Sequence, residues 1–231
     1  MQTYIESTTA TEGPFMVITG LPGSGKTTIS KSLKIETIST DEQLKILKEK
    51  NQHFPNPSGI SDDFRKHELK TIIHSILNGY YKDKTIDLGG AALLQPALAS
   101  ICEILKINII NLEINDEDRV QNLTHDAILL GEENFRKNTV RFIEENEKKE
   151  QFNNLSNEYK HFVFEHKHLA TSREKLETFL STHQNFAKSV ENIRNHCREA
   201  DTKISWRKQV YKRVAEPQTF DDALRSIKVI R

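Results

Sequence analysis

The chain has 231 residues, which is enough for one domain with a substantial core or for a domain with an appendage. Its 33 basic and 33 acidic residues cancel, so the net charge gives no argument for a nucleic acid or an anionic membrane as a partner. Two cysteines are too few for a disulfide framework and no apolar run is long enough to span a membrane, so we expect a cytoplasmic protein. We also expect a monomer.

Residues 1–14 lack the features of a secretory signal and are expected to form a flexible N-terminal extension. The apolar run 15–19 predicts a buried strand, and Ile29 and Leu33, four residues apart, indicate a helix after it. Between them, residues 20–27 fit the phosphate-binding P-loop pattern G-x-x-x-x-G-K-[ST]. The backbone N–H groups of such a loop close around a phosphate. The expected nucleotide-binding residues are Gly20, Gly23, Ser24, Gly25, Lys26, Thr27 and Thr28.

Two side chains of this loop have distinct chemical roles. Lys26 can reach the β- and γ-phosphates of a bound nucleotide. Thr27 can hold Mg²⁺ through its hydroxyl. The loop therefore predicts binding of ATP together with Mg²⁺.

Polar residues follow the second expected strand, at residues 35–38, and precede an expected helix at 41–50. In an open parallel sheet, ligands bind beyond the carboxyl ends of the strands. Asp41 can therefore accept a hydrogen bond from a substrate hydroxyl or act as its base. Alternatively, Thr40 or Asp41 caps the helix, and one residue could serve both roles.

The next expected helix covers residues 62–78, and Ser61 can cap it. Arg65 and Glu68 are three residues apart and so share a face of this helix. Arg65 is then placed to fork onto a carboxylate or a phosphate, with Glu68 orienting it. The alternative is an exposed ion pair that contributes only about 0.3 kcal/mol to stability.

The third expected strand, at residues 85–88, leads into two glycines that let a ligand approach the backbone closely, Gly89 and Gly90. Asp87 occupies the position from which a Walker-B carboxylate holds Mg²⁺ through water. The alternative is a plain turn between strand and helix. The P-loop earlier in the chain favours the first interpretation, with Thr27 and Asp87 as the metal-binding residues.

The remaining elements continue the alternation of strands and helices. Helices are expected at residues 93–104, 116–124 and 172–180, and strands at 107–112 and 161–164. Strands separated by helices imply right-handed crossovers and a parallel sheet that is covered on both faces. We therefore predict a three-layer α/β domain with five parallel strands over residues 15–183.

Residues 184–231 are predicted to form a helical extension with an excess of basic residues. Three apolar stripes have helical spacing: Phe186, Val190, Ile193 and Cys197; Trp206, Val210 and Val214; and Phe220, Leu224 and Ile227, with Thr219 as the cap of the last helix. Because each stripe must be buried, we expect these helices to pack onto the core domain. An arm that binds a protein partner is the alternative.

Taken in order, these motifs resemble the shikimate kinase family of small P-loop kinases over roughly residues 15–183. The resemblance implies a P-loop kinase fold and an anionic acceptor with hydroxyl groups. It implies that Asp41 binds the acceptor hydroxyls and that Arg65, in the F-R-x-x-E motif, holds the acceptor carboxylate. By the same resemblance, Gly89 and Gly90 line that pocket.

The resemblance also implies a lid at about residues 125–150 that closes over the phosphates. The lid of the family carries an arginine, whereas residues 125–130 contain none, so the candidate substitutes are Arg136, Lys137 and Arg141. The family has D-x-D after its second strand, and Ser39 stands at the first of these positions.

These residues favour an ATP-dependent phosphotransferase that acts on a hydroxyl of a small, polar, anionic molecule. Lys26 would stabilise the γ-phosphate, and Asp41 would orient or deprotonate the acceptor hydroxyl. A basic residue from 136–141, such as Arg136, would close over the phosphates. One alternative is a catalytically impaired nucleotide-binding module that acts through a protein partner bound to residues 184–231. Another is a P-loop kinase with a larger acceptor, such as a nucleotide sugar or an RNA end.

Overall fold

A computed structural model describes residues 16–33, 35–50, 62–89, 92–130, 149–202 and 206–229. These residues group into two compact units. The first unit contains the chain up to Leu21, residues 25–113 and residues 207–231. The second unit contains residues 22–24 and 114–206.

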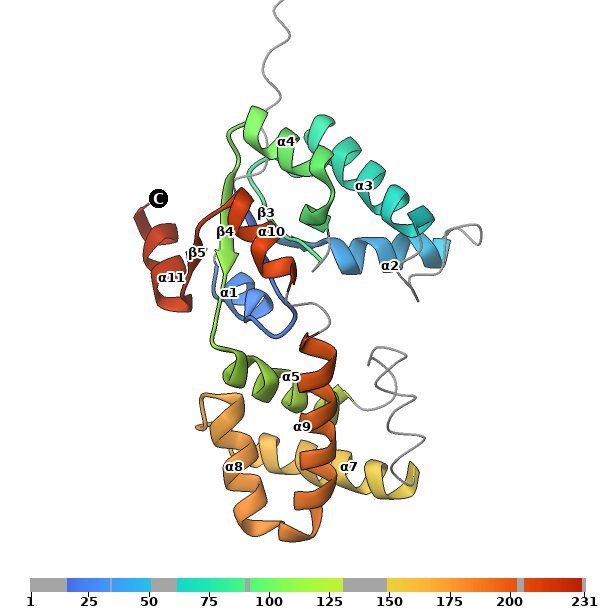
Figure 1. The fold of residues 1–231 in the computed structure, drawn as a ribbon, viewed down its shortest axis with the longest axis vertical. Coiled ribbons are helices and arrows are strands. Elements are labelled where there is room, and N and C mark those ends of the chain that lie inside the picture. Colours follow the sequence, from blue (N-terminus) through green and yellow to red (C-terminus); the bar gives the residue numbers. More distant parts are fainter. Residues whose placement is uncertain are drawn as a thin grey trace, which may run out of the picture. The chain divides into compact units, whose positions relative to one another are not determined.

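A five-stranded sheet forms the centre of the first unit (Figure 1). Its strands are β1 (Met16–Gly20), β2 (Thr37–Ser39), β3 (Thr85–Asp87), β4 (Asn108–Leu112) and β5 (Pro217–Gln218). They are arranged in the order β2-β3-β1-β4-β5, and every pairing is parallel. The predicted α/β class with five parallel strands is confirmed, and the sheet is compatible with the expected three-layer arrangement.

Helices of the first unit lie between these strands in the chain, except the last helix, which follows the last strand. They are α1 (Lys26–Ser32), α2 (Thr40–Lys50), α3 (Asp62–Leu77), α4 (Pro96–Ile104), α10 (Trp206–Val214) and α11 (Phe220–Val229). Met16 and Ile18 of β1 alternate with Val17 and therefore point to one face of the sheet. On that face they pack with Ile29 of α1 and Ile227 of α11, so these two helices cover the same side of the central strand.

The fifth strand is the main correction to the predicted fold. Residues 161–164 were expected to form it, but they lie in α7 (Lys149–Glu165). The apolar residues of this segment have a helical period, because Phe152, Leu155, Tyr159 and Phe162 are buried whereas Phe164 is 68% exposed. The run of apolar residues is thus one turn of an amphipathic helix, and β5 takes the edge of the sheet beside β4.

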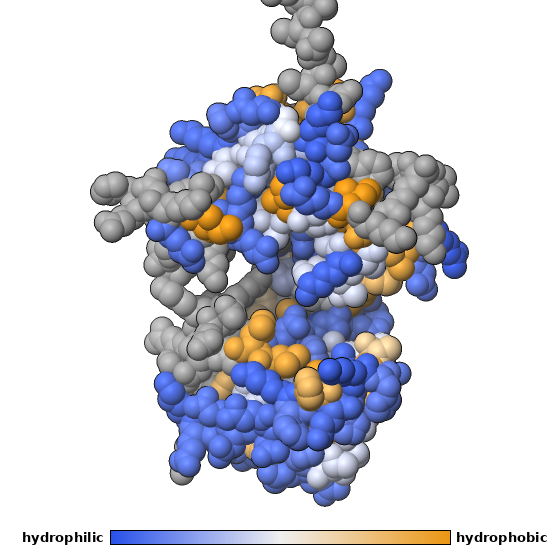
Figure 2. All heavy atoms as spheres, turned by 180° about the vertical axis from the view of Figure 1, so that it is seen from behind, coloured by the Kyte–Doolittle hydropathy of each residue, from blue (hydrophilic) through white to orange (hydrophobic). Residues whose placement is uncertain are grey.

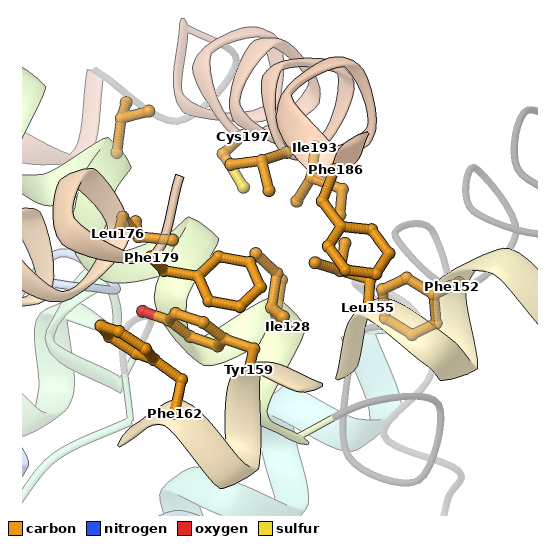
Figure 3. Close-up of a cluster of buried hydrophobic side chains, with 13 residues drawn as sticks. Ile128, Phe152, Leu155, Tyr159, Phe162, Leu176, Phe179, Phe186, Ile193 and Cys197 are labelled. Atoms are coloured by element: carbon orange, nitrogen blue, oxygen red, sulfur yellow. The ribbon is translucent and has the colours of Figure 1, made fainter. Parts of the chain in front are cut away.

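The second unit is helical and has its own core. Besides α7 it contains α5 (Asp116–Leu130), α8 (Ser172–Thr182) and α9 (Ala187–Thr202). Figure 3 shows the aromatic and aliphatic side chains that these helices bring together. The buried members are Val120, Ala127, Ile128, Phe152, Leu155, Tyr159, Phe162, Leu176, Phe179, Phe186, Val190, Ile193 and Cys197.

This grouping differs from the predicted boundary between residues 183 and 184. The stripe predicted on α9 is buried as expected, but α5, α7 and α8 complete its core, so α9 belongs to the second unit. The expected lid at 125–150 begins inside α5, and residues 131–148 lie outside the described part of the chain.

The last two helices return to the first unit. The prediction for α11 is confirmed, because Thr219 Oγ1 accepts a hydrogen bond from the backbone N–H of Asp222 at 3.2 Å and the predicted stripe packs in the sheet core. For α10, the prediction of which face is buried is wrong. Trp206 is 52% exposed, whereas Arg207 and Tyr211 are buried.

We expect Phe179→Ala to lower the free energy of unfolding of the helical unit by about 3–5 kcal/mol. Phe179 is fully buried, and its ring centroid lies 5.0 Å from that of Tyr159 and 5.4 Å from that of Phe162. Chemical denaturation followed by circular dichroism measures the change. Phe164→Ala is the matched control, because its ring is exposed and its removal should change stability by less than about 1 kcal/mol. Equal losses in the two variants would contradict this packing.

A buried histidine gives the helical unit a defined pH dependence. His125 Nδ1 lies 2.7 Å from the Tyr159 hydroxyl, and burial, followed by the charge of Lys175, lowers the pKa of His125 to about 4. The unfolded chain, with a histidine pKa of about 6.5, therefore binds more protons between these two values. We expect stability to fall as the pH drops from about 6.5 to 4.

Replacing this histidine should flatten that profile. The shift corresponds to at most about 3 kcal/mol, so His125→Gln should reduce the pH-dependent loss of stability by up to this amount. His161→Gln, which replaces an exposed histidine on α7 of the same unit, is the control. The measurement is the free energy of unfolding at pH 7 and at pH 4.5. A wild-type profile in His125→Gln would refute the assignment.

Candidate functional site

The P-loop follows the first strand as the sequence predicts. β1 ends at Gly20, and α1 begins at Lys26 with Gly25 as its N-cap. Gly23 has φ +79° and Gly25 has φ +91°, a region that L-residues with side chains rarely adopt. These two glycines are therefore required by the path of the loop.

The Lys26 ammonium group folds back over this loop. Its Nζ donates hydrogen bonds to the carbonyl oxygens of Gly20 at 3.1 Å and of Leu21 at 3.3 Å. The positive charge of Lys26 is thus held against the backbone of the loop, which a bound phosphate would face. The hydroxyl of Ser24 is buried and has no hydrogen-bond partner among the described residues. A buried, unpaired hydroxyl in the loop fits a ligand oxygen, because such a group is costly to leave unsatisfied.

The two residues predicted to bind Mg²⁺ lie together. β1 and β3 are neighbours with Ile18 opposite Asp87, and the Thr27 hydroxyl donates to Asp87 Oδ2 at 3.5 Å. A hydroxyl and a carboxylate are the hard oxygen ligands that Mg²⁺ takes. Among the described residues no group of three His, Cys, Asp or Glu side chains could hold a metal ion.

The environment of Asp87 makes its carboxylate unusually basic. Burial is the main cause that raises the pKa of Asp87 to about 6, and the negative charges of Asp41 and Glu42 add to it. Lys26 and the hydrogen bond from Thr27 act in the opposite direction. The Asp87 carboxylate is therefore buried close to other acidic groups, and nearby positive charge balances its negative charge only in part. A bound cation would supply the missing positive charge.

A buried hydroxyl joins α2 to the end of β3. Thr40 Oγ1 donates to the carbonyl oxygen of Asp87 at 3.4 Å and accepts from the N–H of Gly89 at 2.8 Å. The cap of α2 is Ser39, whose Oγ accepts from the N–H of Glu42 at 3.4 Å. The alternative that Thr40 or Asp41 merely caps this helix is therefore not what the structure has.

The carboxyl group of Asp41 lies against Gly89. Asp41 is in the first turn of α2 and is exposed to solvent. A Cβ atom at Gly89 would lie 3.1 Å from Asp41 Cγ and would collide with Oδ1. The glycine is thus needed for Asp41 to reach this place, close enough to Asp87 for the two charges to interact.

The structure describes the other predicted acceptor-binding residues only in part. Arg65 and Glu68 both lie in α3, and Glu68 is only 1% exposed, which argues against an exposed ion pair. The side chain of Arg65, like Gly90 and Arg136 as a whole, lies outside what the structure describes. Thr28, the last predicted nucleotide-binding residue, is exposed in the first turn of α1.

Two residues beside the loop could not be found from the sequence motif. Phe220 opens α11, and its ring lies 3.6 Å from the position that a Cβ atom of Gly25 would take. Asn122 of α5 donates from Nδ2 to the carbonyl oxygen of Gly23 at 2.8 Å. Both contacts join segments about a hundred or more residues apart, and neither residue belongs to a local pattern.

Comparison with protein-family models finds no match for this chain, and comparison with curated proteins also finds none. Within the described ranges, no helix combines the length and the hydropathy needed to cross a bilayer.

Proposed function

We propose that the protein is an ATP-dependent phosphotransferase that phosphorylates a hydroxyl of a small, polar, anionic molecule. The observation that carries the proposal is the convergence of three elements at the carboxyl ends of neighbouring strands: the P-loop after β1, Asp41 after β2 and Asp87 at the end of β3. Ligands of open parallel sheets bind at this edge.

The phosphate side of the reaction is assigned to the loop. Lys26 is the charged group that would move from the loop carbonyls to the β- and γ-phosphates, and Ser24 offers an unpaired hydroxyl. Thr27 and Asp87 would hold Mg²⁺, which supplies charge neutralisation between the phosphates.

The acceptor side is assigned to the residues around Asp41. Its carboxylate is exposed, lies on Gly89 and is within reach of a hydroxyl that enters this edge of the sheet. Arg65 is proposed to bind the anionic group of the acceptor, as the resemblance to shikimate kinases implies. Phosphoryl transfer requires mainly positioning and charge stabilisation, which these groups provide.

The test is ADP release from ATP and Mg²⁺ in the presence of a panel of hydroxy acids, polyols and sugars that includes shikimate. Lys26→Ala serves as the blank. Release that depends on one acceptor class and is absent from the blank would establish the kinase and its substrate class. ATP binding without ADP release for every acceptor would contradict catalysis.

One observation favours a second function, a nucleotide-binding module that acts through a protein partner. Residues 116–130 and 149–202 form a compact helical unit with a core of its own, which is more than a short lid requires. The face of these helices seen in Figure 2 is largely hydrophilic and also carries a hydrophobic cluster, so a partner there would meet both kinds of group. Pull-down with the full chain in the presence of ATP or ADP distinguishes this role, because a partner should depend on the nucleotide.

A further inference from the structure

The middle of the phosphate loop is fixed by α5. Gly23 and α5 belong to the same compact unit, and Asn122 Nδ2 donates to the Gly23 carbonyl oxygen at 2.8 Å. A Cβ atom on Gly23 would lie 3.0 Å from the carbonyl oxygen of Arg119 and 3.0 Å from Leu123 Cγ. The backbone at Gly23 therefore rests directly on the helix, where no side chain fits.

This contact determines the orientation of the next peptide group. In a planar trans peptide the C=O and the N–H point in opposite directions, and the described residues contain no cis peptide. Because the Gly23 carbonyl is directed at Asn122, the N–H of Ser24 in the same plane points away from α5. That N–H is one of the loop amides that a P-loop directs at phosphate.

We propose that Asn122 is a positioning residue for phosphate binding, which acts through the peptide between Gly23 and Ser24. It holds this peptide so that the Ser24 N–H is directed at a phosphate oxygen. The Ser24 hydroxyl is buried and has no hydrogen-bond partner among the described residues. Lys26 fixes the other half of the loop through the carbonyls of Gly20 and Leu21. The proposal rests on the nucleotide-binding function proposed above.

The experiment compares affinities for three probes, Mg·ATP, inorganic tripolyphosphate and adenosine, by calorimetric titration of the full chain. Asn122→Ala removes the donor, and Asn122→Leu removes it while keeping the volume of the side chain. Asn154→Ala, an exposed asparagine on α7, is the matched control. We expect both Asn122 variants to bind Mg·ATP and tripolyphosphate about tenfold more weakly, with adenosine affinity unchanged and the control like the wild type.

Each other outcome overturns the proposal in a recognisable way. Equal affinity of the Asn122 variants and the wild type for tripolyphosphate would show that the contact is only structural, while nucleotide binding would stand. An equal loss for adenosine would show that the effect is not directed at phosphate. Failure of the wild type to bind either ATP or tripolyphosphate would remove the proposed function and this role together.

Discussion

Lys26→Ala is expected to reduce acceptor-dependent ADP formation by about 10²–10³-fold, which is typical of the loss of one preorganised group that stabilises charge in the transition state. Lys26 is the cation of the phosphate loop, and its Nζ already lies at the loop carbonyls. The measurement is the steady-state rate with Mg·ATP and the acceptor identified from the panel.

Lys31→Ala is the matched control for this prediction. Lys31 lies in the last turn of the same short helix and is exposed, so its removal should leave the rate within about twofold. Thermal unfolding of both variants should show that the fold is retained. A Lys26→Ala variant with the wild-type rate would contradict the role assigned to the loop.

Asp87→Asn should have two opposite effects. Because the carboxylate is proposed to hold Mg²⁺ with Thr27, its loss should lower the Mg²⁺-dependent rate by about 10²-fold. The same variant should stabilise the ligand-free protein near pH 7.5, because a buried charge that is incompletely compensated is removed.

The pKa of Asp87 determines the direction of this change in stability and the pH range in which it occurs. Its value is raised from 3.8 to about 6 in the folded protein, so the folded state binds the proton more tightly and loses stability as the pH rises between these values. The gain in Asp87→Asn should therefore reach up to about 3 kcal/mol above pH 6 and disappear towards pH 4.

Asp83→Asn is the control, since Asp83 is exposed, has φ +59° and lies four residues earlier, in a backbone conformation that asparagine also tolerates. The free energy of unfolding without nucleotide and the rate at varied Mg²⁺ concentration test both effects. Lower stability of Asp87→Asn at pH 7.5 would contradict the environment assigned to this carboxylate.

Local patterns were sufficient for the strands and loops that form the sheet edge. Residues 20–27 combine a motif with a strand before it and a helix after it, so the motif predicted the position of the loop without knowledge of the rest of the chain. Asp41 and Asp87 were found because each follows or ends an apolar strand, and the ends of neighbouring parallel strands lie together.

The fifth strand could not be predicted in the same way. β5 has two residues, Pro217 and Gln218, and no alternation of apolar side chains distinguishes it from the loop between two helices. Residues 161–164 gave a false signal, because one turn of an amphipathic helix contains the same apolar run as a short buried strand. Only the longer spacing from Phe152 to Phe162 separates the two interpretations.

The remaining features could not be predicted because they depend on contacts between residues far apart in the sequence. The hydrogen bond from Asn122 to Gly23 spans 99 residues, and the packing of Phe220 on Gly25 spans nearly the whole chain. On α10, the residues at 207 and 211 have the same helical spacing as the apolar ones at 206 and 210, so the pattern could not show which face is buried. Such choices depend on tertiary packing, which local sequence does not encode.

The central claim is that the P-loop binds the phosphates of ATP with Mg²⁺ at Thr27 and Asp87. Calorimetric titration of the full chain with ATP, once with Mg²⁺ and once with a chelator of divalent cations, tests it most directly. We expect saturable binding with one site per chain, about tenfold or more tighter with Mg²⁺ than without it. Absence of binding at millimolar ATP, or binding that is indifferent to Mg²⁺ and to Asp87→Asn, would contradict the claim.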